Sequence, residues 1–329
     1  MPRNHTIDYI RLISAFGVIL IHLAPSSLNA ESITRYFGIG SVPFFLLTSL
    51  YLFQSKAARF DKINFLRILI PYASWSAIYL IFRTIKSLLT HARVDYDWFA
   101  IVFLGGSAVQ LYFLPLLLCF LITASAINTL FAERDCKTPA KFLAVFSVIF
   151  LIVASNFLKG SSYLGFSSDF FPKSLYYIVF SKAILILIPY LIKMQSQVFF
   201  YGIISASALL FLGIESRFFP DSLASLFLAS IILMVCLMCP VHTTSKLKKS
   251  ILSTTYGIYL CHHLFIEIIE FALNKSSLDY LPYSVSSKLI VAFVVIILST
   301  LFVLLIRRWE ILAFLLLGEA RSNKALEST

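Results

Sequence analysis

Apolar stretches of about 17 to 25 residues recur along nearly the whole chain, and short polar segments separate them. A helix of this length crosses a hydrocarbon core of roughly 30 Å, so each stretch is predicted to be a transmembrane helix. The expected fold class is therefore all-α, a polytopic membrane helix bundle of about ten transmembrane helices. The predicted spans are 7–23, 36–54, 65–83, 111–131, 142–158, 175–193, 198–214, 222–240, 251–273 and 285–306.

Two further apolar segments are too short to cross a membrane. Residues 98–110 are interrupted by Gly105 and Gly106, which predicts an interfacial or re-entrant piece. Residues 311–317 follow the last predicted span, and we expect them to lie along the membrane surface.

The composition is that of an integral membrane protein. Of the 329 residues, 59% are hydrophobic and only 13% are charged, and the mean hydropathy is +0.89. These values lie far from the averages of soluble domains, and few residues remain for a separate soluble domain. We expect one transmembrane domain over residues 1–310, followed by an interfacial segment and a cytoplasmic tail over residues 311–329.

The net charge of +11 is compatible with nucleic-acid binding in a soluble protein. In a membrane protein, however, the distribution of Lys and Arg is more informative than their sum. Most of these residues fall in loops on one side of the ten-span arrangement, so both termini are predicted to be cytoplasmic. Membrane lipid, and no nucleic acid, is the expected partner. Arg83, Lys86 and Arg93 form a cluster on the predicted outer side, where they run against the charge rule.

The five cysteines do not predict a disulfide framework, because four of them fall inside apolar spans. Cys236 and Cys239 have the spacing of a metal or redox pair, but no second pair or nearby histidine accompanies them. We interpret them as small core residues. The sequence also lacks a His-Glu-x-x-His motif, a P-loop and a dinucleotide-binding glycine pattern, so we expect neither a metal nor a permanently bound cofactor.

Two polar residues stand inside the first apolar segment. Arg11 and His22 are eleven positions apart, so their side chains emerge on nearly the same helix face, roughly 16 Å apart along the axis. Asp8 shares this face. Charged residues within a membrane are costly and usually face a protein interior or a cavity that uses them. Two structural alternatives stay open: an arginine that extends to the headgroups beside Asp8, and a histidine that only hydrogen-bonds between helices.

A second polar set occupies the predicted span 251–273. His263, Glu267 and Glu270 are spaced by four and then three residues, so they share a helix face, and Glu267 is placed to orient His263. His262 points about 100° away from His263, so we expect only one of the two to face a site. The set indicates a functional cavity, and the alternative is an internal hydrogen-bonded group that holds this helix to its neighbours.

Five segments of the chain carry recognisable combinations of residues. They are Ile7-Asp8-Tyr9-Ile10-Arg11 with His22, Val42-Pro43-Phe44-Phe45 with Thr48-Ser49, Arg67-x-x-x-Pro71-Tyr72 with Trp75-Ser76, Leu111-Tyr112-Phe113-Leu114-Pro115, and Tyr256-Gly257-Ile258-Tyr259-Leu260-Cys261-His262. In this order they resemble the motifs of the acyltransferase 3 family, membrane proteins that move acyl groups onto carbohydrate and other hydroxyls. Ser49 and Tyr112 depart from the family pattern, which usually has glycine and tryptophan there.

The resemblance implies a membrane O-acyltransferase, most simply an O-acetyltransferase. Its donor would be cytoplasmic acyl-CoA, most simply acetyl-CoA, and its acceptor a carbohydrate or lipid-linked glycan at the outer face of a bacterial cytoplasmic (inner) membrane. His22 is then the candidate base for the acceptor hydroxyl, and Arg11, nearer the inner face, is a candidate to bind a phosphate or the pantetheine arm of coenzyme A. The expected supporting or substrate-binding residues are Asp8, Arg67, Tyr259, His262, His263, Glu267 and Glu270.

A transporter or flippase for a polar or lipid-linked sugar is the rival hypothesis. In that case Arg11, His22, Glu267 and Glu270 would bind the substrate or relay protons. The sequence shows no obvious repeat of half the chain and no paired broken helices, which weakens this hypothesis.

Overall fold

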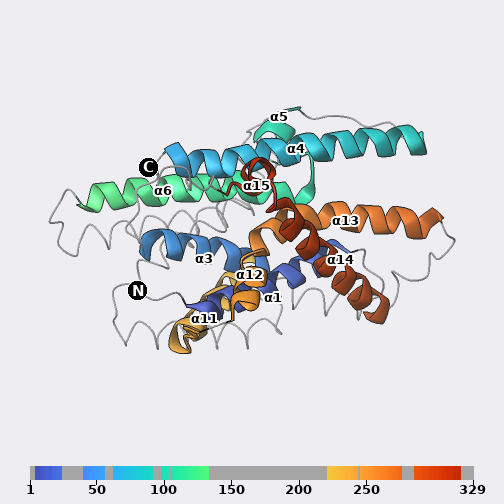
Figure 1. Ribbon diagram of the computed structural model, residues 1–329. Helices are drawn as coiled ribbons and strands as arrows, with labels where there is room; N and C mark the ends of the chain where they lie inside the picture. The colour runs from blue at the N-terminus through green and yellow to red at the C-terminus, as the bar shows by residue number, and fades with distance from the viewer. Residues whose placement is uncertain are drawn as a thin grey trace, which may run out of the picture. The chain divides into compact units, whose positions relative to one another are not determined.

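The computed structural model describes residues 4–23, 40–55, 62–91, 98–103, 105–132, 221–243, 245–275 and 285–319. Every regular element within these residues is a helix, which confirms the all-α class. The spans predicted at 142–158, 175–193 and 198–214 lie outside the described residues. The elements drawn in Figure 1 are α1 (His5–His22), α3 (Ser41–Ser55), α4 (Lys62–Thr90), α5 (Trp98–Phe103), η1 (Val109–Tyr112), α6 (Phe113–Ala132), α11 (Asp221–Met238), α12 (Lys246–Leu252), α13 (Thr255–Lys275), α14 (Val285–Ile306) and α15 (Glu310–Leu317).

Three helical stretches among the described residues are long and apolar enough to cross a membrane. They are Phe65–Thr90 in α4, Thr255–Leu273 in α13 and Val285–Ile306 in α14. α1 is not among them, because Asp8, Arg11 and His22 lower its mean hydropathy. The three stretches support a membrane protein, while the count of about ten spans and the side on which the termini lie stay predictions.

Two of the larger differences from the sequence-based expectation concern the predicted spans 251–273 and 65–83. The predicted span 251–273 is divided between α12 and α13. The hydroxyls of Ser253 and Thr254 donate to helix carbonyl oxygens at 2.7 and 2.6 Å, and such side-chain bonds compete with the helix. α4 continues past the predicted end at Arg83 to Thr90, because leucine, lysine and isoleucine in this stretch propagate a helix.

The predicted break in residues 98–110 is present. The short helix α5 is followed by a turn at Gly105, with a φ of 75°, and then by η1. A Cβ on Gly105 would lie 2.2 Å from the backbone nitrogen of Tyr112, so the turn requires glycine. The Gly105 N–H donates to the Tyr72 hydroxyl at 2.9 Å, and that hydroxyl donates to the Ile101 carbonyl at 2.7 Å. The loop is thereby tied to α4.

The helices fall into two compact units, and each is described by itself. The first comprises residues 1–41, 61–118 and 239–329, and it holds α1, α4, α5, η1 and α12 to α15. The second comprises residues 42–60 and 119–238, with most of α3, most of α6 and all of α11. The candidate site lies within the first unit.

α13 is at the centre of the first unit, where it packs against α1, α14, α15 and η1. A Cβ on Gly257 would lie 2.6 Å from Val303 Cγ2 of α14, so the two helices approach closely there. One turn further along α13, Cys261 Sγ lies 4.0 Å from the carbonyl oxygen of Ser299, which is one turn earlier in α14. The two helices are therefore antiparallel, and small residues allow their contact.

α4 runs parallel to α13 in the first unit (Figure 1). The Tyr79 hydroxyl donates to the Leu260 carbonyl at 2.8 Å. Lys86 Nζ lies 2.5 Å from Glu267 Oε2. Both pairs are separated by 181 positions in the chain, so the two helices keep one register over about two turns.

α15 packs against α4 near the other end of that helix. Trp75 Nε1 donates to the Leu316 carbonyl at 2.9 Å, and Arg67 Nε donates to the Gly318 carbonyl at 3.2 Å. Gly318 has a φ of 65° and closes α15 in the left-handed conformation that glycine favours. The position of residues 311–317 along a membrane surface stays a prediction.

Gly257→Ala is expected to destabilise the first unit by about 1 to 3 kcal/mol, because the Val303 methyls block the new Cβ. The better helix propensity of alanine offsets only part of this, about 1 kcal/mol. Thermal unfolding of the purified protein in detergent measures the effect. Val303→Ala in the same chain should restore most of the stability, and Val303→Ala alone is the control. A higher melting temperature for Gly257→Ala would contradict the close contact.

Candidate active site

Three histidines from two helices meet in the first unit. The ring centroid of His22, at the end of α1, lies 5.4 Å from that of His262 and 5.6 Å from that of His263, both on α13. The two α13 rings are 6.5 Å apart. The expectation that only one of them faces the site stays a prediction, since the His22 ring lies near both side chains although they leave α13 in different directions. We call these three residues the imidazole cluster.

The contacts of His262 fix the position of its ring proton. His262 is 1% exposed, and its Nδ1 lies 2.7 Å from the Tyr259 carbonyl oxygen and 3.2 Å from that of Ile258. Carbonyl oxygens only accept, so Nδ1 carries the proton and Nε2 keeps a lone pair. Nε2 is buried and has no hydrogen-bond partner in the described part of the chain. His262 therefore presents a proton acceptor inside the protein.

A carboxylate links His263 to α4. His263 Nε2 lies 3.4 Å from Glu267 Oε1, the contact that their spacing predicts. The other oxygen, Oε2, lies 2.5 Å from Lys86 Nζ. Glu270 is one turn further along α13 and is half-buried. Lys86 of α4 thus adds a cation to the polar set that the sequence analysis recognised on α13.

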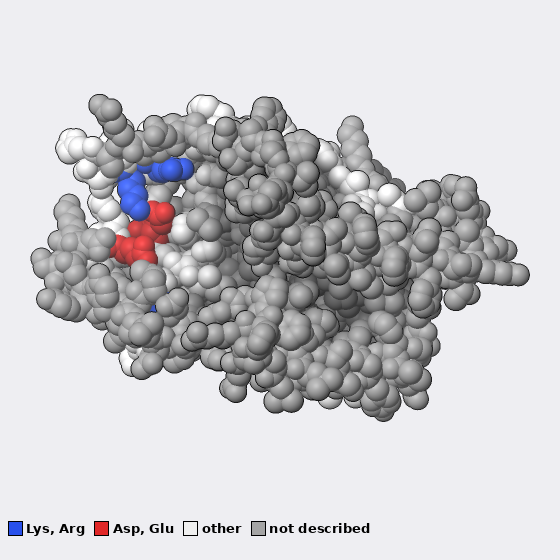
Figure 2. All heavy atoms as spheres, turned by 180° about the vertical axis from the view of Figure 1, so that it is seen from behind, with Lys and Arg blue, Asp and Glu red and all other residues white. Residues whose placement is uncertain are grey.

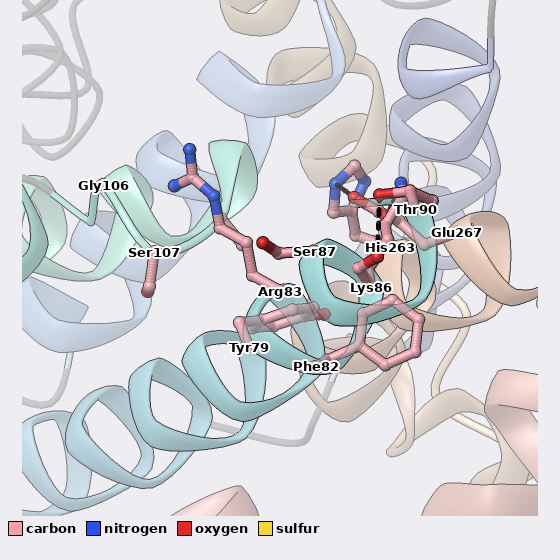
Figure 3. Close-up of a pocket in the computed structure, with 11 residues that line it drawn as sticks. Tyr79, Phe82, Arg83, Lys86, Ser87, Thr90, Gly106, Ser107, His263 and Glu267 are labelled. Carbon is pink, nitrogen blue, oxygen red and sulfur yellow. Dashed lines mark hydrogen bonds and ion pairs between the residues drawn. The ribbon is translucent and has the colours of Figure 1, made fainter. Parts of the chain in front are cut away.

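A pocket adjoins the imidazole cluster on the α4 side. It has a volume of about 510 Å³. Figure 3 shows Arg83 between the loop that carries Ser107 and the dashed contacts of Lys86, Glu267 and His263. Figure 2 shows basic and acidic side chains adjoining on one face of the molecule. The lining residues are Tyr79, Phe82, Arg83, Lys86, Ser87 and Thr90 of α4, Gly106, Ser107 and Ala108 of the loop, and His263 and Glu267 of α13.

The loop before α6 contributes buried polar groups that sequence analysis missed. Gln110 is 0% exposed, yet its side-chain nitrogen and oxygen both lack a hydrogen-bond partner within the described residues. The hydroxyl of Ser107 is also buried and lacks a hydrogen-bond partner within the described residues. The backbone of Gln110 is held by the Tyr259 hydroxyl, which donates to its carbonyl at 3.1 Å. The Gln110 amide approaches the Tyr79 phenol without a well-formed hydrogen bond.

Tyr259 connects the loop with the imidazole cluster. Its ring lies 4.7 Å from that of Phe113 and 5.8 Å from that of His262. Because Tyr259 is buried and bonded to the Gln110 backbone, it fixes η1 beside α13. The expected supporting residues Tyr259, His262, His263 and Glu267 are therefore neighbours in space.

The other expected site residues lie away from the imidazole cluster. α1 is unbroken, so Arg11 is roughly 16 Å from His22 along its axis. Asp8 is buried, and its Oδ2 lies 3.2 Å from His5 Nδ1. Arg67 is bonded to the end of α15 and lies about 18 Å along α4 from Tyr79. Their roles in binding a donor stay predictions.

One sequence signal did point toward the missed residues of α4. Arg83 and Lys86 belong to the cationic cluster that runs against the charge rule for membrane loops. A departure of this kind is expected where a site needs positive charge. Gln110 gave a weaker signal, as an amide directly before the apolar motif that begins at Leu111.

Within the described residues, no three His, Cys, Asp or Glu side chains are arranged to hold a metal ion. The side chains of the site supply imidazole nitrogens, a buried amide, a carboxylate and two cations. An all-helical membrane protein that gathers such groups beside a pocket has the features of a membrane enzyme with acid–base chemistry.

The comparison with protein families agrees with this class. The family model for an acyltransferase domain matches residues 4–308, nearly the whole chain. The protein belongs to the acyltransferase 3 family, as its motifs predicted, and is in general terms a membrane acyltransferase. No curated protein and no solved structure matches the chain.

Removal of the Lys86–Glu267 contact is expected to have a small, coupled effect on stability. The two side chains are 43% and 26% exposed, so their coupling should be about 1 kcal/mol or less. Unfolding of Lys86→Met, Glu267→Gln and the double variant in detergent measures it as a double-mutant cycle. The coupling should fall further in high salt, because water reaches the pair. Strict additivity of the two single effects would contradict the ion pair.

Proposed function

We propose that the protein is a membrane O-acyltransferase, most simply an O-acetyltransferase of a bacterial inner membrane with both termini in the cytoplasm. The donor is acyl-CoA, and the acceptor is a hydroxyl of a surface glycan or lipid-linked sugar. The observation that carries this proposal is the imidazole cluster, which lies beside a polar pocket in a chain of an acyltransferase family.

The proposed reaction needs only proton transfer and stabilisation of one negative charge. The acceptor oxygen attacks the carbonyl carbon of the thioester while its proton passes to an imidazole nitrogen. A C–O bond forms, and the carbonyl oxygen becomes negative. The C–S bond then breaks, the imidazolium returns the proton to sulfur, and the O-acyl ester and the free thiol of coenzyme A leave.

His22 is the proposed base. It belongs to the first motif, and its ring is the one that lies within 6 Å of both other imidazole centroids. His262 supports it, because its Nε2 is an acceptor held inside the protein by the bond that Nδ1 donates. A proton taken from the acceptor hydroxyl by His22 therefore has a second imidazole acceptor nearby, which suits a group that must take up and return a proton.

Gln110 is the proposed donor to the negative carbonyl oxygen. Its amide nitrogen carries two N–H groups, and it is buried without a partner on the loop that also borders the pocket. A donor that is already desolvated and held in place needs little reorganisation when charge develops near it. The bond from the Tyr259 hydroxyl to the Gln110 backbone keeps this loop beside the imidazole cluster.

Arg11 is the proposed contact for the donor. It is half-buried on the same helix as His22, so the two residues border one path of roughly 16 Å. The pantetheine arm of coenzyme A is an extended chain suited to such a path. In this arrangement Arg11 binds a phosphate or the arm, and the thioester reaches His22. Arg67 is a second cation that this proposal assigns to the donor.

His22→Ala is expected to lower kcat by a factor of about 10² to 10⁴, the usual contribution of a general base. Arg11→Ala should instead raise KM for acetyl-CoA about tenfold, as expected for the loss of a charge-assisted contact. Transfer of radiolabelled acetyl groups to a panel of glycans by the purified protein measures both effects. His242→Ala changes an exposed histidine outside the cluster and is the matched control. The proposal is wrong if the parent labels no glycan, or if His22→Ala and Arg11→Ala match the parent.

Gln110→Leu is expected to lower kcat by a factor of about 10² to 10³ without changing KM for acetyl-CoA. Its unfolding temperature should be unchanged or higher, because the variant no longer buries an amide without a hydrogen bond. The same label-transfer assay and thermal unfolding in detergent give the two measurements. Gln54→Leu, at another buried glutamine, is the control for a loss of polarity in the interior. Parallel loss of stability and activity in Gln110→Leu would assign Gln110 a structural role.

A further inference from the structure

α14 has an exposed apolar face that ends at a group of cationic and aromatic residues. From Ile290 to Leu305 the face extends about 22 Å along the helix axis, which is most of a hydrocarbon core of roughly 30 Å. Arg307, Arg308 and Trp309 follow directly. Arginine and tryptophan are typical of the boundary between hydrocarbon and headgroups, so this end of α14 marks a membrane interface. The exposed apolar residues of the face are Ile290, Phe293, Val294, Ile297, Leu298, Leu301 and Leu305.

Arg307 connects α12 with this end of α14. It donates from Nη1 to the Ser253 hydroxyl at 2.7 Å and from Nη2 to the Ser253 carbonyl at 2.9 Å. Ser253 directly follows α12, and the lysines of this helix stand four to seven residues before it. They therefore lie within about 11 Å of Ser253 along the helix axis. α12 and the end of α14 thus share one level of the first unit.

α12 exposes cations together with one apolar side chain. Leu247 is 72% exposed, and Lys246, Lys248 and Lys249 are exposed as well. Leu252 is buried and attaches the helix to the first unit. A lysine in this position can lay its apolar stem along the membrane while its ammonium reaches a headgroup. We call Lys246, Leu247, Lys248, Lys249, Arg308 and Trp309 the interface patch.

The described carboxylates near the interface patch do not balance its charge. The four patch cations form no ion pair among the described residues. Glu319 is bonded to Arg307 at 2.8 Å, and Asp8 is buried beside His5, so neither faces the patch cations. Glu310 is exposed at the start of α15. Four cations and this one carboxylate leave an excess of three positive charges within the described residues.

We propose that the interface patch binds the headgroups of anionic phospholipids. The phosphate of a headgroup attracts the patch cations, and on an anionic membrane surface each cation raises the binding constant about fivefold. Trp309 is 51% exposed, and with Leu247 it supplies apolar contact beside the headgroups. The cations stand at the end of an exposed apolar face that requires hydrocarbon, which favours a lipid over a soluble polyanion.

Trp309 lies within the patch and can report the binding. The purified full-length protein is reconstituted in phosphatidylcholine bilayers that contain a fixed fraction of brominated phosphatidylglycerol or brominated phosphatidylcholine. Bromine quenches tryptophan fluorescence on contact, and the difference between the parent and Trp309→Phe isolates the signal of Trp309. The brominated anionic lipid should bind at Trp309 at least about fivefold more strongly than the neutral one. Equal quenching by the two lipids would overturn the proposal.

Substitution of two patch lysines shows whether the preference arises on α12. In the double variant Lys248→Gln/Lys249→Gln, both lipids should quench Trp309 nearly alike, and the unfolding temperature should stay that of the parent because the changed side chains are exposed. High salt should weaken the preference of the parent, because exposed charges are screened. A preference that survives both substitutions would contradict the proposal.

The double variant Arg83→Gln/Lys86→Gln is the matched control, because it removes two cations three residues apart on α4. It should retain the preference of Trp309 for the anionic lipid. An equal loss of preference in the two double variants would show a general effect of net charge and would reject the interface patch as its source.

Coenzyme A is the other phosphate-bearing molecule to be distinguished. In neutral phosphatidylcholine bilayers, calorimetric titration should give the parent and Lys248→Gln/Lys249→Gln the same affinity for coenzyme A. Weaker binding of coenzyme A by the variant, with an unchanged lipid preference, would assign the lysines to the donor and overturn the lipid proposal. Acyl transfer takes no part in these measurements, so failure of the proposed function would leave the inference standing.

Discussion

The close contact between Gly257 and Val303 sets the position of α13, and the candidate site depends on that position. Tyr259, Leu260, His262, His263 and Glu267 follow within a few turns of the same helix, and together they contact η1, α4 and α1. Protein interiors are close-packed, so α13 cannot turn by one residue without displacing all of these contacts together. A contact between two apolar surfaces therefore controls where the polar groups meet.

Periodicity along the sequence predicted much of the local structure but not the pairing of helices. α14 begins and ends where the apolar stretch 285–306 predicted, and the contact of His263 with Glu267 follows from their spacing. The packing of α13 against α4 does not follow from residue spacing. Spacing shows which residues share one helix face, but it does not identify the helix that packs against that face. Lys86 and Tyr79, each 181 positions from its partner, were missed for this reason. Gln110 was missed because its burial depends on the turn at Gly105 and on the bond from Tyr259.

α1 carries Arg11 and His22 on one face but keeps them far apart along its axis. His22 belongs to the imidazole cluster, whereas Arg11 lies roughly 16 Å away along an unbroken helix. The two residues are too far apart for a hydrogen bond, so Arg11 does not orient His22 directly. Two positions joined by a rigid helix keep a fixed separation, and a ligand that contacts both must be at least as long. An extended donor such as acyl-CoA meets this requirement better than a compact substrate does.

Within the described residues, the buried polar groups of the site that lack a hydrogen-bond partner are of two chemical kinds, and each kind comes from a different element. Burying an amide or hydroxyl without a hydrogen bond costs roughly 1 to 3 kcal/mol for each group. Several such groups on adjoining elements therefore lower the folding stability substantially, and packing alone does not explain them. α13 contributes two ring nitrogens, His262 Nε2, which keeps a lone pair, and His263 Nδ1, whereas the loop contributes donors, at Gln110 Nε2 and the Ser107 hydroxyl. The attack of a hydroxyl on a carbonyl needs these two kinds of group at once, an acceptor for the proton and a donor for the negative oxygen. Because acceptors and donors come from separate elements, a substrate that lies between α13 and the loop would satisfy both sets.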